Sequence, residues 1–240
     1  MDWKIVHIDE TDSTNRWLKA RASGFSPDDC IAVVADYQTA GRGCGTNSWE
    51  SERGKNLLCS LLIHPTGIPA NRQFLISEWV SVALCELLES YIYNKVEIKW
   101  PNDIYVDGRK ICGILIENRL QGDHIKDSII GIGLNINQRE FQSDAPNPVS
   151  LCQLLGREVD REEVLLRFLQ RKPLVSTAET DGFSYRNRLF LRRKPAEYQD
   201  CEGRFKATLV DVEPDGRLVM IDEEGRERRY AFKEVQFVLR

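Results

Sequence analysis

The sequence lacks the features that mark a membrane or a secreted protein. No stretch of about 18 consecutive apolar residues, the length of a membrane span, occurs in the chain. Residues 1–4 (MDWK) lack the basic and then apolar order of a signal peptide. Lys and Arg number 33 against 37 Asp and Glu, and the resulting net charge of -4 argues against a general nucleic-acid binder. We therefore expect a cytoplasmic protein with neither a membrane nor DNA as its partner.

Patterns typical of metal binding and of disulfides are missing as well. The three His show no metal-ligand spacing, so we expect no structural zinc. The seven Cys are odd in number and form no CxxC pair. Cys59, Cys85 and Cys112 lie within apolar segments, where a reduced thiol acts as a small core residue. The sequence thus predicts the free thiols of a cytoplasmic protein.

The remaining composition is that of a globular protein whose pattern changes near residue 195. Hydrophobic residues make up 42% and charged residues 29%, which excludes an intrinsically disordered chain. Periodicity predicts strands over 4–8, 31–37, 56–63, 96–99, 103–106, 111–118 and 128–136. It predicts a first helix that follows the cap candidates within 11–15 and ends near residue 22, and further helices over 71–91, 149–155 and 160–170. Asp160 is the expected cap of the last of these helices, and Pro173 its expected stop. After residue 195 the periodicity predicts a small all-β module with strands over 204–212, 217–221, 228–232 and 235–239.

The first candidate ligand-binding segment is a Gly-rich stretch over residues 41–45 (GRGCG). Its glycines allow a backbone to approach a ligand closely and expose N–H groups to an anion. Arg42 can bind a carboxylate or a phosphate. The stretch is no P-loop, because no Gly-Lys-Ser/Thr ends it. On its own, such a loop is more often a flexible connection than a site.

Three further segments place polar groups or glycines at strand ends and within strands. Residues 99–103 (KWPND) hold a cation, an amide and a carboxylate around a rigid proline, although Asn and Asp also serve plain turns. Lys110 begins an apolar strand, where a lone lysine is commonly a solvated edge charge. Gly131 and Gly133 interrupt another apolar strand, which often marks the close approach of a ligand or another chain.

In this order, and together with the polar stretch TDSTN (11–15) that precedes them, the four segments resemble the biotin protein ligase family. The matching stretches are TDSTN (11–15), ADYQTAGRG (35–43), KWPNDIYVDGRKICGILIE (99–117) and GIGLNIN (131–137). The resemblance covers about residues 1–170. It implies an α+β fold, with a catalytic domain over 1–190 in which helices pack on a mixed β-sheet, and a small SH3-like all-β barrel over 195–240. Because TDSTN begins at residue 11, we expect the short form, without the N-terminal DNA-binding domain that some members carry.

The resemblance implies an ATP-dependent ligase, a biotin–[acetyl-CoA-carboxylase] ligase. In this family biotin attacks the α-phosphate of ATP, which gives biotinyl-5′-AMP and pyrophosphate. A specific lysine of a biotin carboxyl carrier domain then attacks the mixed anhydride and releases AMP. ATP with Mg²⁺ and biotin are therefore expected as substrates rather than as resident cofactors, and the carrier domain as the protein partner. The resemblance also allows a homodimer.

Each matching polar residue inherits an expected role from this resemblance. Lys110 and Arg42 are the expected catalytic cations at the biotin carboxylate and the α-phosphate, and Asp103 is the expected Mg²⁺ ligand. The residues expected at biotin and its adenylate are Ser13, Thr14, Asn15, Gln38, Gly41, Arg42, Gly43, Cys44, Lys110, Gly113, Gly131 and Gly133. Those expected at the nucleotide are Trp49, Lys99, Trp100, Asn102 and Asn135.

Two departures from the family pattern and two other functions remain open at this point. Cys44 stands where many members carry an arginine, which reflects either tolerated variation or a looser hold on the adenylate. The stretch 171–184 has no functional account. A lipoate or octanoate ligase or transferase of the same fold is the first alternative, and a biotin-responsive DNA-binding regulator is the second. We also expect the loop over 39–55 to be mobile without ligand and ordered over the adenylate.

Overall fold

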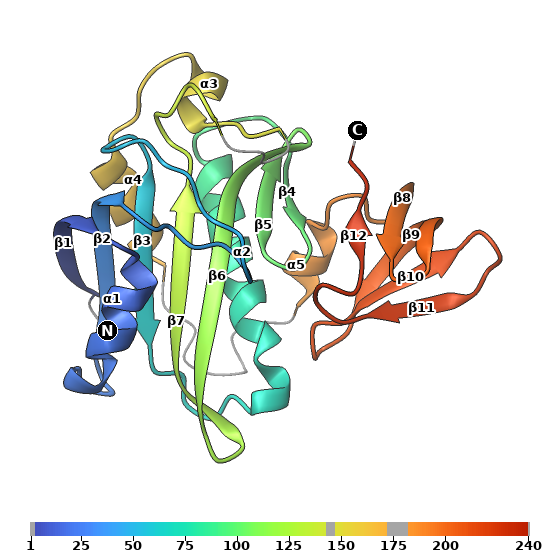
Figure 1. Cartoon of the computed structure of the whole chain (residues 1–240), viewed down its shortest axis with the longest axis horizontal. Helices are drawn as coiled ribbons and strands as arrows, with labels where there is room; N and C mark the ends of the chain where they lie inside the picture. The colour runs from blue at the N-terminus through green and yellow to red at the C-terminus, as the bar shows by residue number, and fades with distance from the viewer. Residues whose placement is uncertain (1–2, 143–146, 172–181, 240) are drawn as a thin grey trace.

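The computed structural model describes residues 3–142, 147–171 and 182–239, which form two β-sheets with helices packed on the first (Figure 1). The larger sheet has seven strands in the order β1-β2-β3-β7-β6-β5-β4. β1 runs parallel to β2, whereas all other neighbours are antiparallel, so this sheet is mixed as predicted. Its strands are β1 (Trp3–Thr11), β2 (Cys30–Gln38), β3 (Leu57–Ile63), β4 (Val96–Lys99), β5 (Asp103–Val106), β6 (Arg109–Gln121) and β7 (His124–Leu134).

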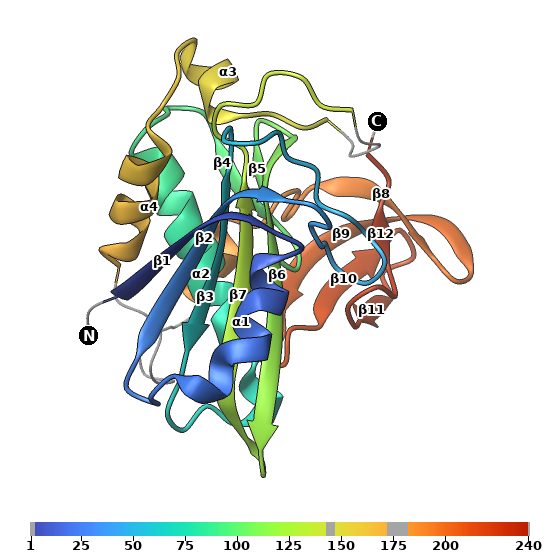
Figure 2. The ribbon, with the colours of Figure 1, turned by 60° about the vertical axis from the view of Figure 1, so that its left-hand side comes forward.

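Helices cover both faces of this sheet, and the alternation of side chains along β2 shows how. Ile31 and Val33 pack with Leu18 of α1 (Thr14–Arg21) on one face. Their neighbours Ala32 and Val34 belong to the larger core on the other face, which also holds the apolar sides of α2 (Phe74–Glu89) and α4 (Arg161–Leu169). Figures 1 and 2 show α1 in front of the sheet and α2 behind it.

Local capping chemistry explains where the shorter helices begin and end. Asp160, the predicted cap of α4, accepts a hydrogen bond from the Glu162 N–H at 2.9 Å. Ser150 and Gln153 form a capping box at the start of α3 (Leu151–Leu155). α5 (Phe183–Asn187) and two 3-10 turns, η1 (Ala22–Gly24) and η2 (Ala70–Arg72), complete the described helical segments. The predicted helix stop at Pro173 and most of the 171–184 stretch lie outside the described residues.

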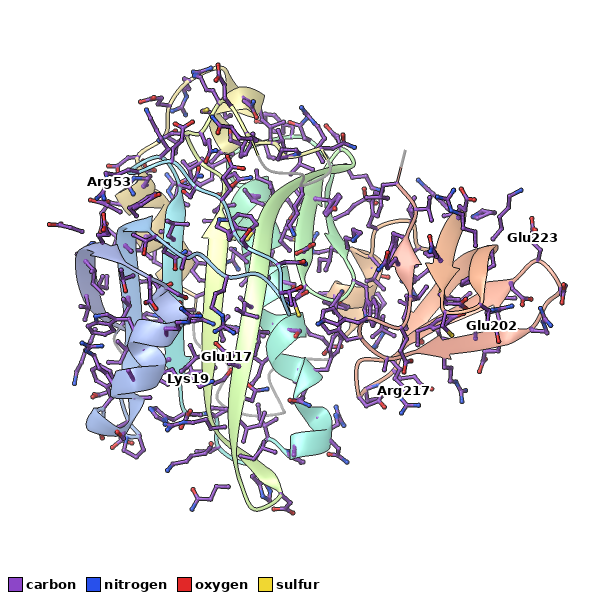
Figure 3. The ribbon with its side chains drawn as sticks, viewed as in Figure 1. Lys19, Arg53, Glu117, Glu202, Arg217 and Glu223 are labelled. Carbon is purple, nitrogen blue, oxygen red and sulfur yellow. The ribbon has the colours of Figure 1, made fainter. Side chains whose placement is uncertain are left out.

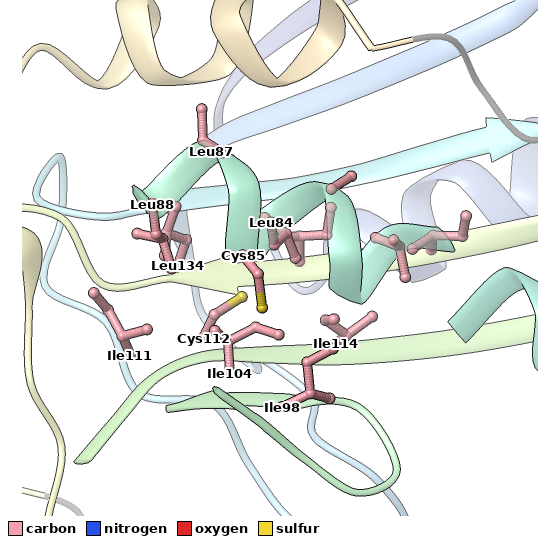
Figure 4. Packing of buried hydrophobic residues seen from close by; sticks show 14 of the residues in the cluster. Leu84, Cys85, Leu87, Leu88, Ile98, Ile104, Ile111, Cys112, Ile114 and Leu134 are labelled. Carbon is pink, nitrogen blue, oxygen red and sulfur yellow. The ribbon is translucent and has the colours of Figure 1, made fainter. Parts of the chain in front are cut away.

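The larger core is closed by apolar contacts between α2 and the strands β4 to β7. Figure 4 shows Leu84, Cys85 and Leu88 of α2 packed against side chains from these strands, with the Cys85 and Cys112 thiols facing each other. Burial raises the pKa of both thiols, and it raises the pKa of Cys59 to about 12. These thiols therefore stay protonated and pack as small apolar groups, which confirms the predicted core role of all three.

The second sheet is antiparallel and follows directly after the helical segments. Its strands, in the order β11-β10-β9-β8-β12, are β8 (Pro195–Asp200), β9 (Gly203–Val212), β10 (Leu218–Asp222), β11 (Glu227–Tyr230) and β12 (Gln236–Phe237). β8 was not predicted, because its sequence PAEYQD is polar and only Tyr198 is buried. The predicted fold class is confirmed, since a mixed sheet with helices precedes a second antiparallel sheet. None of the described helices is long and apolar enough to cross a membrane.

A polar and aromatic joint fastens the second sheet to the first. The Trp100 Nε1–H donates a hydrogen bond to the Gly216 carbonyl at 2.9 Å. Gly216 has a positive φ of 93° and lies against Phe74, whose Cδ2 would be only 2.5 Å from a Cβ at this position. The Phe190 ring lies between those of Tyr105 and Phe237, with centroid distances of 5.4 and 6.5 Å. The two sheets thus share an interface that needs a residue without a side chain at position 216.

A carboxylate cluster holds the turn and the strands of the second sheet. Asp222 accepts hydrogen bonds from the Arg226 backbone N–H at 2.9 Å and from the Arg228 guanidinium at 2.9 Å. Asp200 accepts one from the Tyr230 hydroxyl at 2.7 Å. Burial raises the pKa of Asp222, but these hydrogen bonds lower it more, to about 2. In contrast, the charged side chains of Glu202, Arg217 and Glu223 extend outward from this sheet (Figure 3).

This cluster predicts that the second sheet loses stability in acid. The folded-state pKa of Asp222, about 2, lies below the unfolded value of about 3.9, so its contribution is present above that value and is lost as the pH falls toward 2. In thermal unfolding between about pH 5 and pH 2, Asp222→Asn should be less stable than the wild type at the upper end and should lose less stability on acidification. Parallel curves for the two proteins would contradict this assignment.

Candidate active site

A cavity of about 1050 Å³ lies between the two sheets, and the predicted site residues converge on it. Its walls come from the start of α1, the Gly-rich loop, the strands β3 to β7 and the second sheet. Every predicted site residue lines this cavity except Gly41. Gly41 lies behind it, where its carbonyl accepts a hydrogen bond from the Trp49 N–H at 2.9 Å. The roles assigned to these residues remain predictions, but their convergence in space is a finding.

One corner of the cavity is a network of buried hydrogen bonds around the start of α1. The Gln38 side-chain oxygen accepts hydrogen bonds from the Thr14 N–H at 2.8 Å and the Thr14 hydroxyl at 3.1 Å. The Ser60 hydroxyl lies 2.6 Å from both Thr14 Oγ1 and Asn15 Oδ1. Ser13 is the cap residue directly before α1, but its hydroxyl makes no capping hydrogen bond. We call these residues, Ser13, Thr14, Asn15, Gln38 and Ser60, the polar corner. The first four line the cavity, whereas Ser60 is buried and contacts Thr14 and Asn15 without lining it.

Ser60 and Glu117 belong to this region, and neither was among the predicted site residues. Ser60 is the single hydroxyl within the apolar run of β3, so its sequence context carried a signal. Glu117 accepts hydrogen bonds from Asn15 at 3.0 Å and Lys19 at 3.1 Å, and it pairs with Arg42 at 3.2 Å. Figure 3 shows Lys19 and Glu117 side by side. Glu117 thus holds the cation of the Gly-rich loop beside the polar corner.

These contacts also set the charge of Glu117. Burial raises its pKa, but the hydrogen bonds from Asn15 and Lys19 and the charge of Arg42 lower it more, so the net shift is downward. The carboxylate is therefore ionised at neutral pH and opposes the Arg42 charge. Its position directly after the apolar run Ile114-Leu115-Ile116 was the available sequence signal.

At the end of the cavity opposite the polar corner, a register shift between β5 and β6 brings Lys110 and Asp103 together. Asp103 lies opposite Gly113. The register then changes between Ile104 and Tyr105, so that Tyr105 lies opposite Lys110. Opposed residues share a face of the sheet, and this one-residue bulge therefore puts Lys110 on the same face as Asp103 and Gly113. The Lys110 ammonium lies 2.7 Å from the Asp103 carboxylate.

A second lysine from β4 adds to this cationic end. Lys99 lies opposite Asp103 in the β4–β5 hairpin, and its ammonium lies 5.6 and 5.0 Å from the Tyr105 and Phe237 ring centroids. Burial lowers the pKa of Lys99, the neighbouring Lys110 lowers it further, and Asp103 opposes both effects. Two lysines thus face one carboxylate, which leaves an excess of positive charge. Such an end of a cavity favours an anionic ligand.

The two predicted nucleotide amides are partly engaged by the protein itself. The Asn102 side-chain amide donates to the Ile114 carbonyl at 2.6 Å, and that of Asn135 donates to the Val149 carbonyl at 3.1 Å. Asn135 Oδ1, in contrast, is buried and has no hydrogen-bond partner among the described residues. A buried acceptor without a partner is costly, so a ligand N–H or O–H is expected at this atom.

Gly113 of β6 and Gly133 of β7 form a flat surface, which we call the floor, and the Trp49 indole packs on it. A Cβ on Gly113 would be 2.7 Å from Trp49 Cζ3, and one on Gly133 would clash with the same indole. Gly131 plays the equivalent part for Asn15. In this structure side chains of the chain itself lie against these glycines, and the approach of a ligand to them stays a prediction. Stacking of Trp49 on adenine remains a prediction.

The loop over 39–55 contains none of the described helices or strands, as predicted, although its tip is internally bonded. Arg42 and Ser48 form an isolated bridge, and the Gly43 N–H donates to the Asn47 carbonyl at 2.8 Å. Cys44 is half-buried, which raises its pKa, while the charge of Lys233 opposes that shift. Mobility of this loop without ligand stays a prediction.

The packing of Trp49 on the floor predicts a specific coupling with Gly133. Gly133→Ala should destabilise the protein by about 1–3 kcal/mol, because the new methyl group overpacks against the indole. In a Trp49→Ala background the same change should be neutral or stabilising, since alanine is the better strand residue. Urea unfolding of the four proteins of this cycle measures the coupling. Equal costs in both backgrounds would show that Trp49 does not occupy the floor.

Comparisons with known proteins agree with this site. Residues 8–135 match the model of the biotin/lipoate A/B protein ligase family. The bifunctional ligase/repressor BirA of Bacillus spizizenii is 34% identical over 248 residues, covering 96% of this chain and 73% of the relative. BirA of Bacillus subtilis is 34% identical over 70% of this chain, and the match spans about half (52%) of that relative. The biotin–[acetyl-CoA-carboxylase] ligase of Mycobacterium tuberculosis is 28% identical over 70% of this chain and 62% of the relative.

A solved structure extends the likeness to both sheets. The biotin protein ligase from Aquifex aeolicus in complex with biotin and ATP superimposes with a TM-score of 0.76 and 28% identity, covering 98% of this chain and 99% of that chain. The family match spans the strands and loops that carry most of the cavity, from the polar corner to Asn135. On the sequence match, the shared fold and the cavity together, the chain belongs to the biotin/lipoate A/B protein ligase family.

Proposed function

We propose that this chain is a biotin protein ligase, which activates biotin with ATP and transfers it to a lysine of a biotin carboxyl carrier domain. The observation that carries the proposal is the pairing of the polar corner with a cationic end in one cavity. The ring of biotin presents a urea, which needs both donors and acceptors, and its tail ends in a carboxylate. A cavity with these two ends fits such a molecule, and the Aquifex aeolicus relative was solved with biotin and ATP.

The first reaction brings together two anions, which the cations of the cavity make feasible. A biotin carboxylate oxygen attacks the α-phosphorus of ATP, a new P–O bond forms, and the bond to pyrophosphate breaks. Lys110 and Arg42 offset the negative charge that gathers at this phosphorus, while Asp103 and Glu117 hold the two cations in place. In the second step the carrier lysine amine attacks the biotinyl carbonyl, loses a proton, and AMP departs.

Mg²⁺ enters this scheme as part of the ATP substrate. The described residues hold no group of three His, Cys, Asp or Glu that could bind a metal ion alone. Mg²⁺ commonly keeps several waters and takes one or two carboxylates together with substrate phosphates. Asp103, partly exposed in the cavity, fits such a single-carboxylate contact. We therefore infer that Mg²⁺ binds Asp103 only together with the nucleotide.

The location and the remaining partners follow from the same proposed function. We infer a cytoplasmic location, because the reaction uses ATP and the cysteines are free thiols. No DNA partner is proposed, in view of the net charge of -4. A homodimer stays a prediction. A lipoate or octanoate ligase is the alternative to test, since the matching family model includes lipoate ligases.

Biotinylation of a carrier domain tests the function directly. The purified chain, Mg·ATP and a biotin carboxyl carrier domain are incubated with biotin or with lipoate, and the carrier is weighed by mass spectrometry. We expect the carrier to gain one biotinyl group and nothing from lipoate. A carrier whose target lysine is replaced by arginine serves as the control and should gain nothing. Lipoylation without biotinylation would overturn the proposal in favour of the alternative.

Replacement of Lys110 tests the assignment of the cationic end. Lys110→Ala should slow biotin-dependent pyrophosphate release by about a hundred- to a thousandfold, because a charged donor at the reacting phosphate is lost. The melting temperature should change little, since the Lys110–Asp103 pair is partly exposed. Lys126→Ala, an exposed position of β7 outside the cavity, is the matched control. Near wild-type pyrophosphate release from Lys110→Ala would remove Lys110 from the reaction.

A further inference from the structure

The second sheet contributes a cation of its own to the cavity. Lys233 lies in the turn between β11 and β12 and lines the cavity beside Phe232. Its ammonium touches the Gly-rich loop, because a Cβ on Gly45 would clash with Lys233 Nζ. Figure 2 shows the loop between β2 and β3 reaching across to the second sheet. The charge of Lys233 also acts on Cys44, the neighbouring uncharged residue of the loop.

Lys233 lies in a tight turn that holds it beside the Gly-rich loop. Lys233 has a positive φ of 72°, in the left-handed region that glycine adopts freely and lysine rarely. The turn is closed by a hydrogen bond from the Glu234 N–H to the Ala231 carbonyl at 3.1 Å. The Glu234 carboxylate in turn accepts one from the Ala231 N–H at 2.7 Å. This turn therefore keeps Lys233 beside the Gly-rich loop in a conformation that a glycine would adopt without strain.

Unlike Arg42 and Lys110, Lys233 has no carboxylate partner among the described residues. Lys110 and Arg42 each pair with a carboxylate, at 2.7 and 3.2 Å. Among the described residues no carboxylate oxygen lies within 4.0 Å of Lys233 Nζ. Lys233 is also exposed, whereas the side chains of Lys110 and Arg42 are only 21% and 32% exposed. Lys233 is therefore an exposed cation that lines the cavity without a carboxylate partner, and its ammonium lies 5.9 Å from the Phe232 ring centroid.

We propose that Lys233 binds the β- and γ-phosphates of ATP, the part of the nucleotide that departs as pyrophosphate. This inference rests on the proposed function and refines its nucleotide site. The α-phosphate must meet the biotin carboxylate near the inner cations, so the rest of the triphosphate extends toward the opening. There an exposed ammonium without a carboxylate partner can bind phosphate oxygens as a point charge and release them to solvent.

Four variants of the full chain test the proposal. Lys233→Gln removes the charge, and Lys233→Gly removes the side chain and also relieves the left-handed backbone. Lys233→Arg keeps the charge. Lys206→Gln, on exposed β9 of the same sheet and outside the cavity, is the matched control. For each protein we measure KM for ATP, KM for biotin, inhibition by added pyrophosphate, the lifetime of enzyme-bound biotinyl-AMP and the melting temperature.

We expect KM for ATP to rise about five- to tenfold in Lys233→Gln and Lys233→Gly, with a matching weakening of pyrophosphate inhibition. KM for biotin and the lifetime of biotinyl-AMP should not change, and Lys233→Arg and Lys206→Gln should behave as wild type. The melting temperature of Lys233→Gly should equal or exceed that of the wild type, which separates lost binding from lost folding.

Two results would overturn the assignment of Lys233. The first is an unchanged KM for ATP together with unchanged pyrophosphate inhibition. The second is an effect confined to the lifetime of biotinyl-AMP, which would place Lys233 at the α-phosphate. A wild-type protein that forms no biotinyl-AMP would instead overturn the proposed function, so the two failures are distinguishable.

Discussion

The cavity depends on a one-residue bulge in β6, because that bulge decides which way Lys110 points. In a regular ladder Lys110 and Gly113, three residues apart, would lie on opposite faces of the sheet. The extra residue puts both on the cavity face with Asp103, so that the ammonium, the carboxylate and the bare floor are neighbours. Without this register shift Lys110 would point to the other face of the sheet, and Lys99 of β4 would be left as the lysine at this end of the cavity.

The cations of the cavity are held loosely enough to exchange their partners. The Lys110–Asp103 and Arg42–Glu117 pairs are between one-fifth and one-third exposed, and ion pairs of this exposure contribute only about 0–1 kcal/mol. A carboxylate and a triphosphate carry more negative charge than the two acidic side chains and can take over their cations at little cost. The acidic residues therefore position the cations without locking them away from an anionic ligand.

Sequence reasoning found most of this site because its signals are local, and it missed what depends on contacts between distant segments. The loop over 39–55, the KWPND turn and the helix caps are each encoded in a few neighbouring residues. The bulge in β6 is a matter of pairing between strands, and no pattern within 109–121 revealed it. Likewise, Glu117 is paired with Arg42, 75 residues earlier in the chain. Trp49 packs on glycines of β6 and β7, which also lie far from it in the sequence.

The KWPND turn joins the chemistry of the cavity to the attachment of the second sheet. Lys99 and Asp103 face the cavity, while Trp100 between them donates its indole N–H to Gly216 in the second sheet. The second sheet in turn supplies Phe237 against the Lys99 ammonium and Lys233 against the Gly-rich loop. A shift of this sheet would therefore alter the surroundings of Lys99 and of the loop together. The small sheet thus forms a wall of the cavity, and its docking constrains the same residues of the KWPND turn and of the loop that line this cavity.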